Sequence, residues 1–229
     1  MPEENPIKGF GTLTPLQKEF LGILASLPDK DQFYLAGGTA LAEYYLGHRL
    51  SFDLDYFTGV ENLVLPTSYQ IESACQKNNL PIKVIRRFST FVEFLVEKEN
   101  ESLKIDLALD SPFRFEPTKF SSEGIFINDY PDLRIDKLLA YFGRSEPRDA
   151  VDLYFIMQRE PVKLLLELAA QKDPGFDLYW FALALNRCEN FPDELERWPV
   201  KMIQPFDPRK LKLTFLDWAM ELMDKTTKK

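Results

Sequence analysis

The stretch of sequence that decides the fold is Leu35-Ala36-Gly37-Gly38-Thr39-Ala40-Leu41, followed after a short segment by His48-Arg49-Leu50-Ser51-Phe52-Asp53-Leu54-Asp55-Tyr56-Phe57. Its two glycines follow an apolar, strand-like run and precede a helix-compatible segment, residues 39–46. Because glycine has no Cβ atom, the backbone at this point can approach a ligand closely. Free N–H groups at the start of a helix attract anions. The stretch therefore predicts a phosphate-binding turn at Gly37 and Gly38, with the Thr39 hydroxyl as a further donor.

Asp53 and Asp55 stand two positions apart in an extended-looking run. Alternation along a strand places both carboxylates on one face, and it places Phe52, Leu54 and Tyr56 on the other. Two carboxylates this close repel each other unless a cation lies between them. Magnesium takes hard oxygen ligands and completes its shell with water and substrate phosphates. The pattern predicts a magnesium site at Asp53 and Asp55, and the alternative interpretation is a pair of loop acids.

Two polar residues, Arg49 and Ser51, precede these acids. Both are candidates for phosphate contact, or Arg49 pairs with an acid and orients it, and the sequence leaves both interpretations open. His48 is the single histidine of the chain. One histidine argues against histidine-based hydrolase chemistry and against a histidine-rich metal site.

Taken in order, these motifs resemble those of the AbiEii/AbiGii nucleotidyltransferase-like toxin family, within the polymerase-beta-like nucleotidyltransferase superfamily. The matching pieces are Gly37-Gly38-Thr39, Arg49-x-Ser51-x-Asp53-x-Asp55, Lys137 and Arg148-Asp149-x-x-Asp152. The resemblance implies a nucleotidyltransferase that takes an NTP with Mg²⁺. It also implies a growth-inhibiting toxin of a toxin–antitoxin or phage-defence system, encoded with a cognate antitoxin, and some members of the family modify tRNA ends.

Asp106 is the candidate for a third acid. It lies in the alternating run from Leu103 to Asp110, on the same face as Lys104 and opposite the apolar side chains. In polymerase-like nucleotidyltransferases two carboxylates on one strand and a third on a neighbouring strand hold the metals for in-line displacement. The resemblance thus assigns Asp106 as metal ligand or base, and the alternative is a solvated strand face. Asp110 is assigned to a turn with Ser111.

Lys137 lies in a helical segment ahead of Arg148. A cluster of such cations can neutralise a triphosphate, and the alternative is a solvated helix face. The resemblance makes Lys137 a catalytic candidate, because the family has a functional lysine in this helix. It maps the last functional acid of the family onto Asp152 or Asp149. We assign Asp152 as the catalytic candidate, and Arg148 and Asp149 to nucleotide or phosphate binding.

Local patterns predict an α/β (α+β) fold. A capping box, Thr14-Pro15-Leu16-Gln17, opens the first helix. Periodicity and turn residues then predict a helix over 66–78, strands over 82–87, 90–96 and 103–109, and helices over 132–142, 147–158, 161–171, 176–187 and 208–224. We expect a nucleotidyltransferase-like mixed-sheet domain over residues 1–128 and a helical domain over 129–229 that completes the active-site cleft, where NTP and magnesium bind.

Composition limits the partners and the compartment. The 229 residues carry a formal net charge of -8, which argues against a protein whose main role is to coat nucleic acid. Cys75 and Cys188 are far apart and have no C-x-x-C companion, so neither disulfides nor a zinc site are expected, and a cytoplasmic location is predicted. No apolar run reaches the about 18 residues of a membrane span. We expect no membrane partner.

The predicted function is transfer of a nucleotidyl group from an NTP to an acceptor hydroxyl, with RNA or tRNA as the expected acceptor. Two alternatives remain at this point. One is an antibiotic-type, small-molecule nucleotidyltransferase, for which the acids around Asp106 and Asp110 would suit a cationic acceptor. The other is a non-catalytic nucleotide-binding protein on the same fold, since a fold does not by itself establish a reaction.

Overall fold

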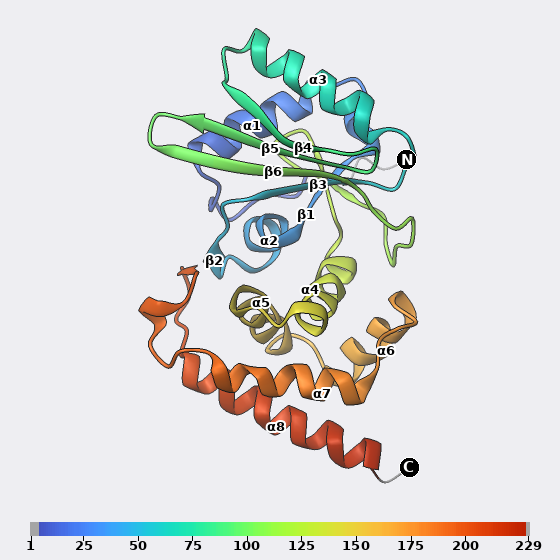
Figure 1. The fold of residues 1–229 in the computed structure, drawn as a ribbon, viewed down its shortest axis with the longest axis vertical. Coiled ribbons are helices and arrows are strands. Elements are labelled where there is room, and N and C mark those ends of the chain that lie inside the picture. The colour runs from blue at the N-terminus through green and yellow to red at the C-terminus, as the bar shows by residue number, and fades with distance from the viewer. Residues whose placement is uncertain (1–4, 228–229) are drawn as a thin grey trace. The chain divides into compact units, whose positions relative to one another are not determined.

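The structure is a computed structural model that describes residues 5–227. Its contacts divide the chain into two compact units, with the division between Asp132 and Leu133. The first unit holds a sheet with flanking helices, and the second unit is mainly helical (Figure 1).

Within residues 5–132 the first unit contains a seven-stranded mixed sheet with the order β4-β5-β6-β3-β1-β8-β7. Strand β1 pairs antiparallel with β3 and parallel with β8, and β3 pairs parallel with β6. The pairs β4–β5, β5–β6 and β7–β8 are antiparallel. The predicted mixed α/β architecture is therefore confirmed. The elements are α1 (Pro15–Ala25), η1 (Lys30–Gln32), β1 (Tyr34–Ala36), α2 (Gly37–Leu41), η2 (Ala42–Leu46), β2 (Arg49–Leu50), β3 (Leu54–Thr58), α3 (Val64–Lys77), β4 (Ile82–Arg87), β5 (Phe91–Lys98), β6 (Glu101–Leu109), β7 (Lys119–Phe120), β8 (Phe126–Ile127) and the start of α4 (Tyr130–Arg144).

Helices α1 and α3 cover one face of the sheet, and α2 packs on β1 and β3 from the other side (Figure 1). The covered face is apolar: Tyr56, Phe94 and Ile105 are fully buried. Burying each large apolar side chain stabilises a fold by about 2 kcal/mol, so a register slip of one residue would be costly. The apolar face thus fixes the register of β3, β5 and β6. It fixes with it the acids that alternate onto the opposite face, among them Asp55 and Asp106.

The start of α1 shows why the local sequence signal is strong. The Thr14 hydroxyl accepts a hydrogen bond from the Gln17 N–H at 3.2 Å, and the Gln17 side chain accepts one from the Thr14 N–H at 2.9 Å. This reciprocal capping box satisfies two N–H groups that a helix start otherwise leaves unpaired. The predicted start at Pro15 is confirmed.

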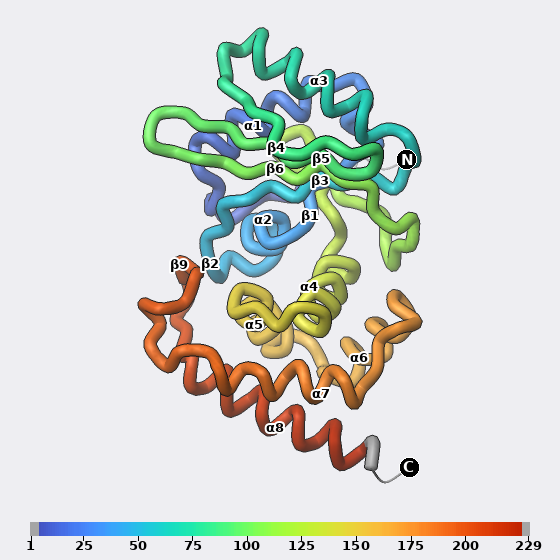
Figure 2. The backbone as a smooth tube through the Cα atoms, viewed as in Figure 1, coloured from blue at the N-terminus to red at the C-terminus, as the bar shows by residue number. Residues whose placement is uncertain are grey.

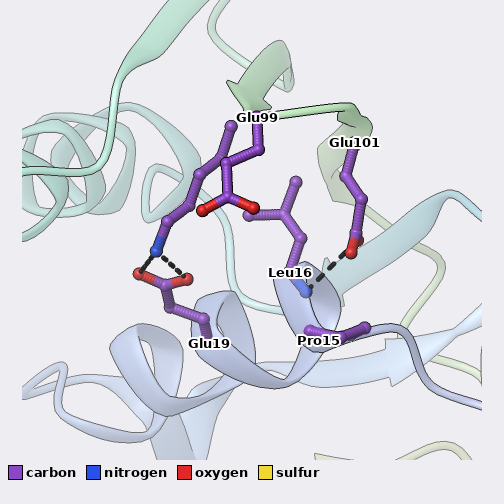
Figure 3. Close-up of a pocket in the computed structure, with 6 residues that line it drawn as sticks. Pro15, Leu16, Glu19, Glu99 and Glu101 are labelled. Atoms are coloured by element: carbon purple, nitrogen blue, oxygen red, sulfur yellow. Dashed lines mark hydrogen bonds and ion pairs between the residues drawn. The ribbon is translucent and has the colours of Figure 1, made fainter.

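A carboxylate on β6 supports the same helix end. Glu101 accepts a hydrogen bond from the Leu16 N–H at 3.3 Å, and Lys98 binds both carboxylate oxygens of Glu19 on α1. Figure 3 shows these side chains around a small pocket. Because Glu101 and Glu19 are used to attach the β5–β6 hairpin to α1, we assign this pocket to the scaffold.

The second unit is a helical assembly. Its elements are the rest of α4, α5 (Pro147–Met157), α6 (Val162–Lys172), α7 (Leu178–Asn186), η3 (Arg187–Asn190), η4 (Leu195–Arg197), β9 (Lys201–Met202) and α8 (Pro208–Thr227). Helices α7 and α8 lie side by side (Figure 2). The core of this unit is aromatic: the ring centroids of Phe181 on α7 and Trp218 on α8 are 5.2 Å apart, as are those of Tyr141 on α4 and Phe215 on α8.

Element boundaries differ from prediction in two instructive places. Helix α3 begins at Val64 rather than at Pro66, because proline is tolerated in a first helical turn. The helix after the glycine pair begins at Gly37 rather than at Thr39 and continues as a π-helical turn over Ala42–Leu46. Among residues 5–227 no helix is both long enough and apolar enough to cross a membrane.

Candidate active site

Gly37 and Asp55 are fitted to each other. Strands β1 and β3 pair Ala36 with Asp55, and the chain then turns into α2 with Gly37 at a φ of +65°. A Cβ atom added to Gly37 would overlap the Asp55 carboxylate. Glycine is therefore required for two reasons: a positive φ strains any L-residue, and the acid occupies the space that a side chain would need.

Gly38 makes room for the other predicted polar residues. A Cβ atom at Gly38 would lie 2.6 Å from Arg49 Nη2 and 2.9 Å from Ser51 Oγ. Arg49 is only 4% exposed, and its Nη1 donates to the Leu50 carbonyl at 3.0 Å. The structure thus brings Arg49 and Ser51 to the glycine pair. Phosphate contact by either side chain stays a prediction.

Thr39 connects the glycine turn to the first acid. Its hydroxyl donates a hydrogen bond to the backbone carbonyl of Asp53, and the residue is only 2% exposed. Asp53 itself is half-buried and lies one residue before β3 begins. Phe52, expected on the same face as Leu54 and Tyr56, is 42% exposed whereas those two are buried, because strand alternation begins only at Leu54. Thr39 therefore positions Asp53 in this structure, and its contact with phosphate remains a prediction.

Asp106 lies beside Asp55, because the parallel pair β3–β6 aligns these two residues. Neighbouring strands are about 4.8 Å apart. The Oδ2 atom of Asp106 accepts a hydrogen bond from Lys104 Nζ at 2.8 Å, while its Oδ1 is buried and has no hydrogen-bond partner in the described part of the chain. Buried polar atoms normally have a hydrogen-bond partner, so this oxygen has an acceptor position that a bound cation could occupy.

The donor chemistry fits magnesium. Asp53, Asp55 and Asp106 offer hard oxygen atoms, and Asp106 Oδ1 has an unused acceptor position. Across residues 5–227, however, no three histidine, cysteine, aspartate or glutamate side chains are grouped as they would be around a metal. Metal ligation by these three acids therefore stays a prediction.

Sequence reasoning misses Glu93. The antiparallel pair β5–β6 places Glu93 opposite Asp106, and Glu93 Oε2 lies 3.1 Å from Arg86 Nε on β4. One charged row consequently crosses four neighbouring strands, and it consists of Asp55, Asp106, Glu93 and Arg86. The alternation around Glu93 indicates its face of the strand. Its partner across the sheet follows only from the register.

Lys104 lies on β6 beside this row, and its side chain is 41% exposed. Burial lowers the pKa of Lys104, but the hydrogen bond to Asp106 and the charges of Glu93 and Asp53 outweigh that effect and hold the pKa above its ordinary value. The side chain is therefore an ammonium cation at neutral pH.

A second group of predicted residues comes together within the second unit. Lys137 Nζ lies 2.9 Å from Asp152 Oδ2 and 3.7 Å from Asp149 Oδ1. Arg144 binds Asp149 with two hydrogen bonds, from Nε at 2.6 Å and from Nη2 at 2.9 Å. Asp149 and Asp152 are almost fully buried and Lys137 is 7% exposed. A solvated helix face, the alternative interpretation for Lys137, is therefore wrong.

The remaining predicted residues are placed differently. Arg148 lies outside the buried cluster: its side chain is 45% exposed and its Nη2 is 3.4 Å from Glu146. Asp110 accepts hydrogen bonds from the Tyr34 hydroxyl at 2.6 Å and from the Ser111 N–H at 2.8 Å. The prediction that Asp110 belongs to the turn is confirmed.

A buried acid pair at the start of α4 has no counterpart in the sequence analysis. Asp129 and Asp132 are at most 1% exposed, and the Asp132 N–H donates to Asp129 Oδ1 at 2.9 Å. The Phe115 N–H donates to Asp132 Oδ2 at 2.9 Å, and Arg114 Nη1 lies 3.8 Å from Asp129 Oδ2. Burial, together with a hydrogen bond to the Asp132 side chain and the charge of that carboxylate, raises the pKa of Asp129 to about 7, although the Asp132 N–H and Arg114 act in the opposite direction. The pair thus holds a proton at mildly acidic pH.

Comparison with known proteins now adds to this geometry. Residues 19–201 match the family described as the nucleotidyl transferase AbiEii toxin of a type IV toxin–antitoxin system. The chain belongs to the AbiEii nucleotidyltransferase toxin family. An uncharacterised protein of Aquifex aeolicus (strain VF5) is 31% identical over 182 residues, which are 79% of this chain and 84% of that protein.

Two solved structures share the fold of this AbiEii-family chain. A protein described as a nucleotidyltransferase from H. pylori is 22% identical, with a TM-score of 0.62 and coverage of 94% of this chain and 98% of that chain. MenT4, a nucleotidyltransferase toxin of Mycobacterium tuberculosis H37Rv, is 18% identical, with a TM-score of 0.61 and coverage of 91% and 82%. At these identities the likeness shows the fold alone.

Membership in the AbiEii family confirms the predicted class of enzyme. The chain is a nucleotidyltransferase, and the alternative of a non-catalytic nucleotide-binding protein is not supported. The family description places its toxins in toxin–antitoxin systems, which implies an antitoxin partner and an NTP substrate.

Proposed function

We propose that this AbiEii-family enzyme transfers a nucleotidyl group from an NTP to a hydroxyl of RNA, with tRNA as the foremost candidate, and that it does so with Mg²⁺. In this reaction the acceptor oxygen forms a bond to the α-phosphorus, the bond from that phosphorus to the β-phosphate breaks, and pyrophosphate leaves. The acceptor hydroxyl loses its proton. The proposal needs a metal-binding acid set and a place for the phosphates.

The observation that carries the proposal is the alignment of Asp55 with Asp106 on neighbouring parallel strands. Asp55 comes directly from the Asp-x-Asp motif, and Asp106 presents a buried oxygen without a hydrogen-bond partner in the described chain. A carboxylate pair on adjacent strands suits one metal ion better than two unrelated loop acids would. The fit of Gly37 around the Asp55 carboxylate keeps that acid at the glycine turn.

Each residue has a distinct part in the proposal. Asp53, Asp55 and Asp106 would hold Mg²⁺, which when bound supplies positive charge toward the phosphate oxygens. Asp106 is the candidate to accept the proton of the acceptor hydroxyl. The candidates for phosphate contact are Gly38, Arg49 and Ser51. The motifs add four further candidates for nucleotide or phosphate binding: Gly37, Thr39, Arg148 and Asp149. Lys137 and Asp152, in the second unit, remain catalytic candidates.

The test is incorporation of labelled NTPs into RNA or tRNA by the purified chain, comparing wild type with Asp55→Asn and Asp106→Asn. Each variant keeps the size of the side chain and removes the anionic ligand, so labelling should fall at least about a hundredfold. Asp110→Asn is the matched control, because Asp110 is an acid that directly follows β6 and whose carboxylate serves the turn. Equal labelling by wild type and Asp55→Asn would overturn the proposal.

Toxicity and the partner are tested in cells. Growth should stop when wild type is expressed and should continue when Asp55→Asn is expressed to the same level. We propose that a cognate antitoxin restores growth in the presence of the wild-type chain. Continued growth with abundant wild-type protein would contradict the toxin assignment without affecting the labelling result.

A further inference from the structure

Acids accumulate on one face of the sheet around Asp106. Asp55 lies beside it on β3 and Glu93 lies opposite it on β5. Like charges in directly opposite positions destabilise a sheet. Three carboxylates on three neighbouring strands therefore require cations, and Arg86 and Lys104 supply two of them.

The outer acid of the row is compensated by its own partner. Arg86 on the edge strand β4 lies 3.1 Å from the Glu93 carboxylate. Asp106 is compensated by Lys104, whose Nζ is 2.8 Å from Asp106 Oδ2. The two cations therefore have different partners: Arg86 pairs with Glu93 at the edge of the sheet, and Lys104 pairs with Asp106, which we propose as a metal ligand.

We propose that Lys104 is a built-in counter-ion that competes with the divalent metal for Asp106 and so lowers the metal affinity of the site. This inference rests on the proposed function, because it assumes that Asp106 is a metal ligand. The ammonium group binds Asp106 Oδ2 and a metal ion would bind Oδ1, so both bring positive charge to one carboxylate and repel each other. Metal binding is therefore weakened for as long as the ammonium group stays.

The structure shows why Lys104 is the group that leaves. Its side chain is 41% exposed, while that of Asp106 is 20% exposed. A lysine ammonium is a strongly hydrated point charge on a flexible four-carbon stem, so it can swing into water without a large desolvation cost. Asp106 sits on a strand whose register is fixed by the buried face, so its carboxylate stays. The sheet is therefore charge-compensated before metal binds, and the lysine is released when metal arrives.

The experiment measures Mn²⁺ binding to the full chain by electron paramagnetic resonance, with Mn²⁺ as the probe for the magnesium site and without NTP. Lys104→Met keeps the stem and removes the charge. Because an ion pair of this exposure contributes up to about 1 kcal/mol, the Mn²⁺ dissociation constant should fall by up to about fivefold. Lys104→Arg keeps the positive charge at the same position and should stay within about twofold of wild type.

Lys83→Met is the matched control for net charge. Lys83 lies opposite Leu95 on the edge strand β4, so it shares the face of the row, and it is paired with Glu97 at 2.6 Å. The control removes one positive charge two strands away from Asp106. Tighter Mn²⁺ binding by Lys104→Met than by Lys83→Met supports the inference. Equal binding by the two variants overturns it, because net charge would then account for the whole effect.

Asp106→Asn separates the two possible failures. If Asp106→Asn weakens Mn²⁺ binding while Lys104→Met binds like wild type, the counter-ion inference is wrong and the proposed metal site stands. If Asp106→Asn binds Mn²⁺ like wild type, or if wild type binds none, the proposed metal site is wrong and the inference falls with it. Lys104→Gln, which is also uncharged, repeats the measurement should the methionine variant fold poorly, with circular dichroism confirming that each variant is folded.

Discussion

The Lys137–Asp152 pair gives the most quantitative prediction. The two groups are 2.9 Å apart, and their side chains are 9% and 0% exposed. Lys137→Met removes the ammonium and leaves the Asp152 carboxylate buried without it. Asp149 is affected less, because Arg144 binds both of its oxygens.

The expected cost follows from burial. Removing one partner of a buried ion pair typically destabilises a protein by about 3–5 kcal/mol, because the remaining charge stays out of water. An exposed pair contributes no more than about 1 kcal/mol. Lys163→Met, which removes one partner of the exposed i,i+4 pair Lys163–Glu167 in the same unit, is therefore a matched control. Its effect should stay below about 0.5 kcal/mol.

The assay is urea unfolding followed by tryptophan fluorescence. All three tryptophans of the chain, Trp180, Trp198 and Trp218, lie in the second unit, so the signal reports the unit that holds the pair. The double variant Lys137→Met/Asp152→Leu replaces both charges with apolar groups and should cost at least about 1 kcal/mol less than the sum of the two single variants. Additive single effects, or a cost below about 1 kcal/mol for Lys137→Met, would refute the argument that burial makes this pair strong.

Two further predictions concern the first unit. Gly37→Ala should destabilise the protein by more than Gly11→Ala. Both glycines have positive φ values, +65° and +83°, so in both variants backbone strain costs about 1–2 kcal/mol, but only the Cβ at Gly37 would meet the Asp55 carboxylate, whereas the one at Gly11 meets nothing within 4 Å. Equal losses of melting temperature would contradict the role of the acid. Asp129 keeps in the fold a proton that the unfolded chain loses near the ordinary aspartate value of 3.8, so the wild-type free energy of unfolding should fall as pH rises from about 4 to about 7, by a contribution on the order of 4 kcal/mol. Asp129→Asn should lack this contribution in urea unfolding across that pH range, and an unchanged slope would show that Asp129 does not hold the proton.

Local signals account for the elements that the sequence predicts well. The capping box starts α1, and alternation identifies β4 and β6 to within two residues at either end. The turn between β5 and β6 is tighter than expected, because Glu99 adopts a φ of +54° and both strands extend farther into it. An acidic residue in that conformation leaves little local signal, since a left-handed backbone is typical of glycine or asparagine.

The candidate site divides in the same way between local and distant information. Spacing brings Asp149 and Asp152 to one side of a helix, and the resemblance to a known family selects Lys137, so the sequence is enough to anticipate this cluster. The pairing of Glu93 with Asp106 depends on which strands become neighbours. Those neighbours are set by burial of distant apolar residues, which periodicity within one segment does not reveal.

The glycine pair shows how this changes a functional argument. From sequence alone, Gly37 and Gly38 are explained by the close approach of a phosphate. In the structure the space beside them is used by the chain itself, since the Asp55 carboxylate lies where a Gly37 Cβ would be, and Arg49 and Ser51 lie against Gly38. The glycines therefore do not need a ligand to explain them. Their role is to let the Asp55 carboxylate and the Arg49 guanidinium reach the same turn. The glycine motif and the Asp-x-Asp motif therefore form one structural unit. A ligand at this turn would meet side chains that are already in place.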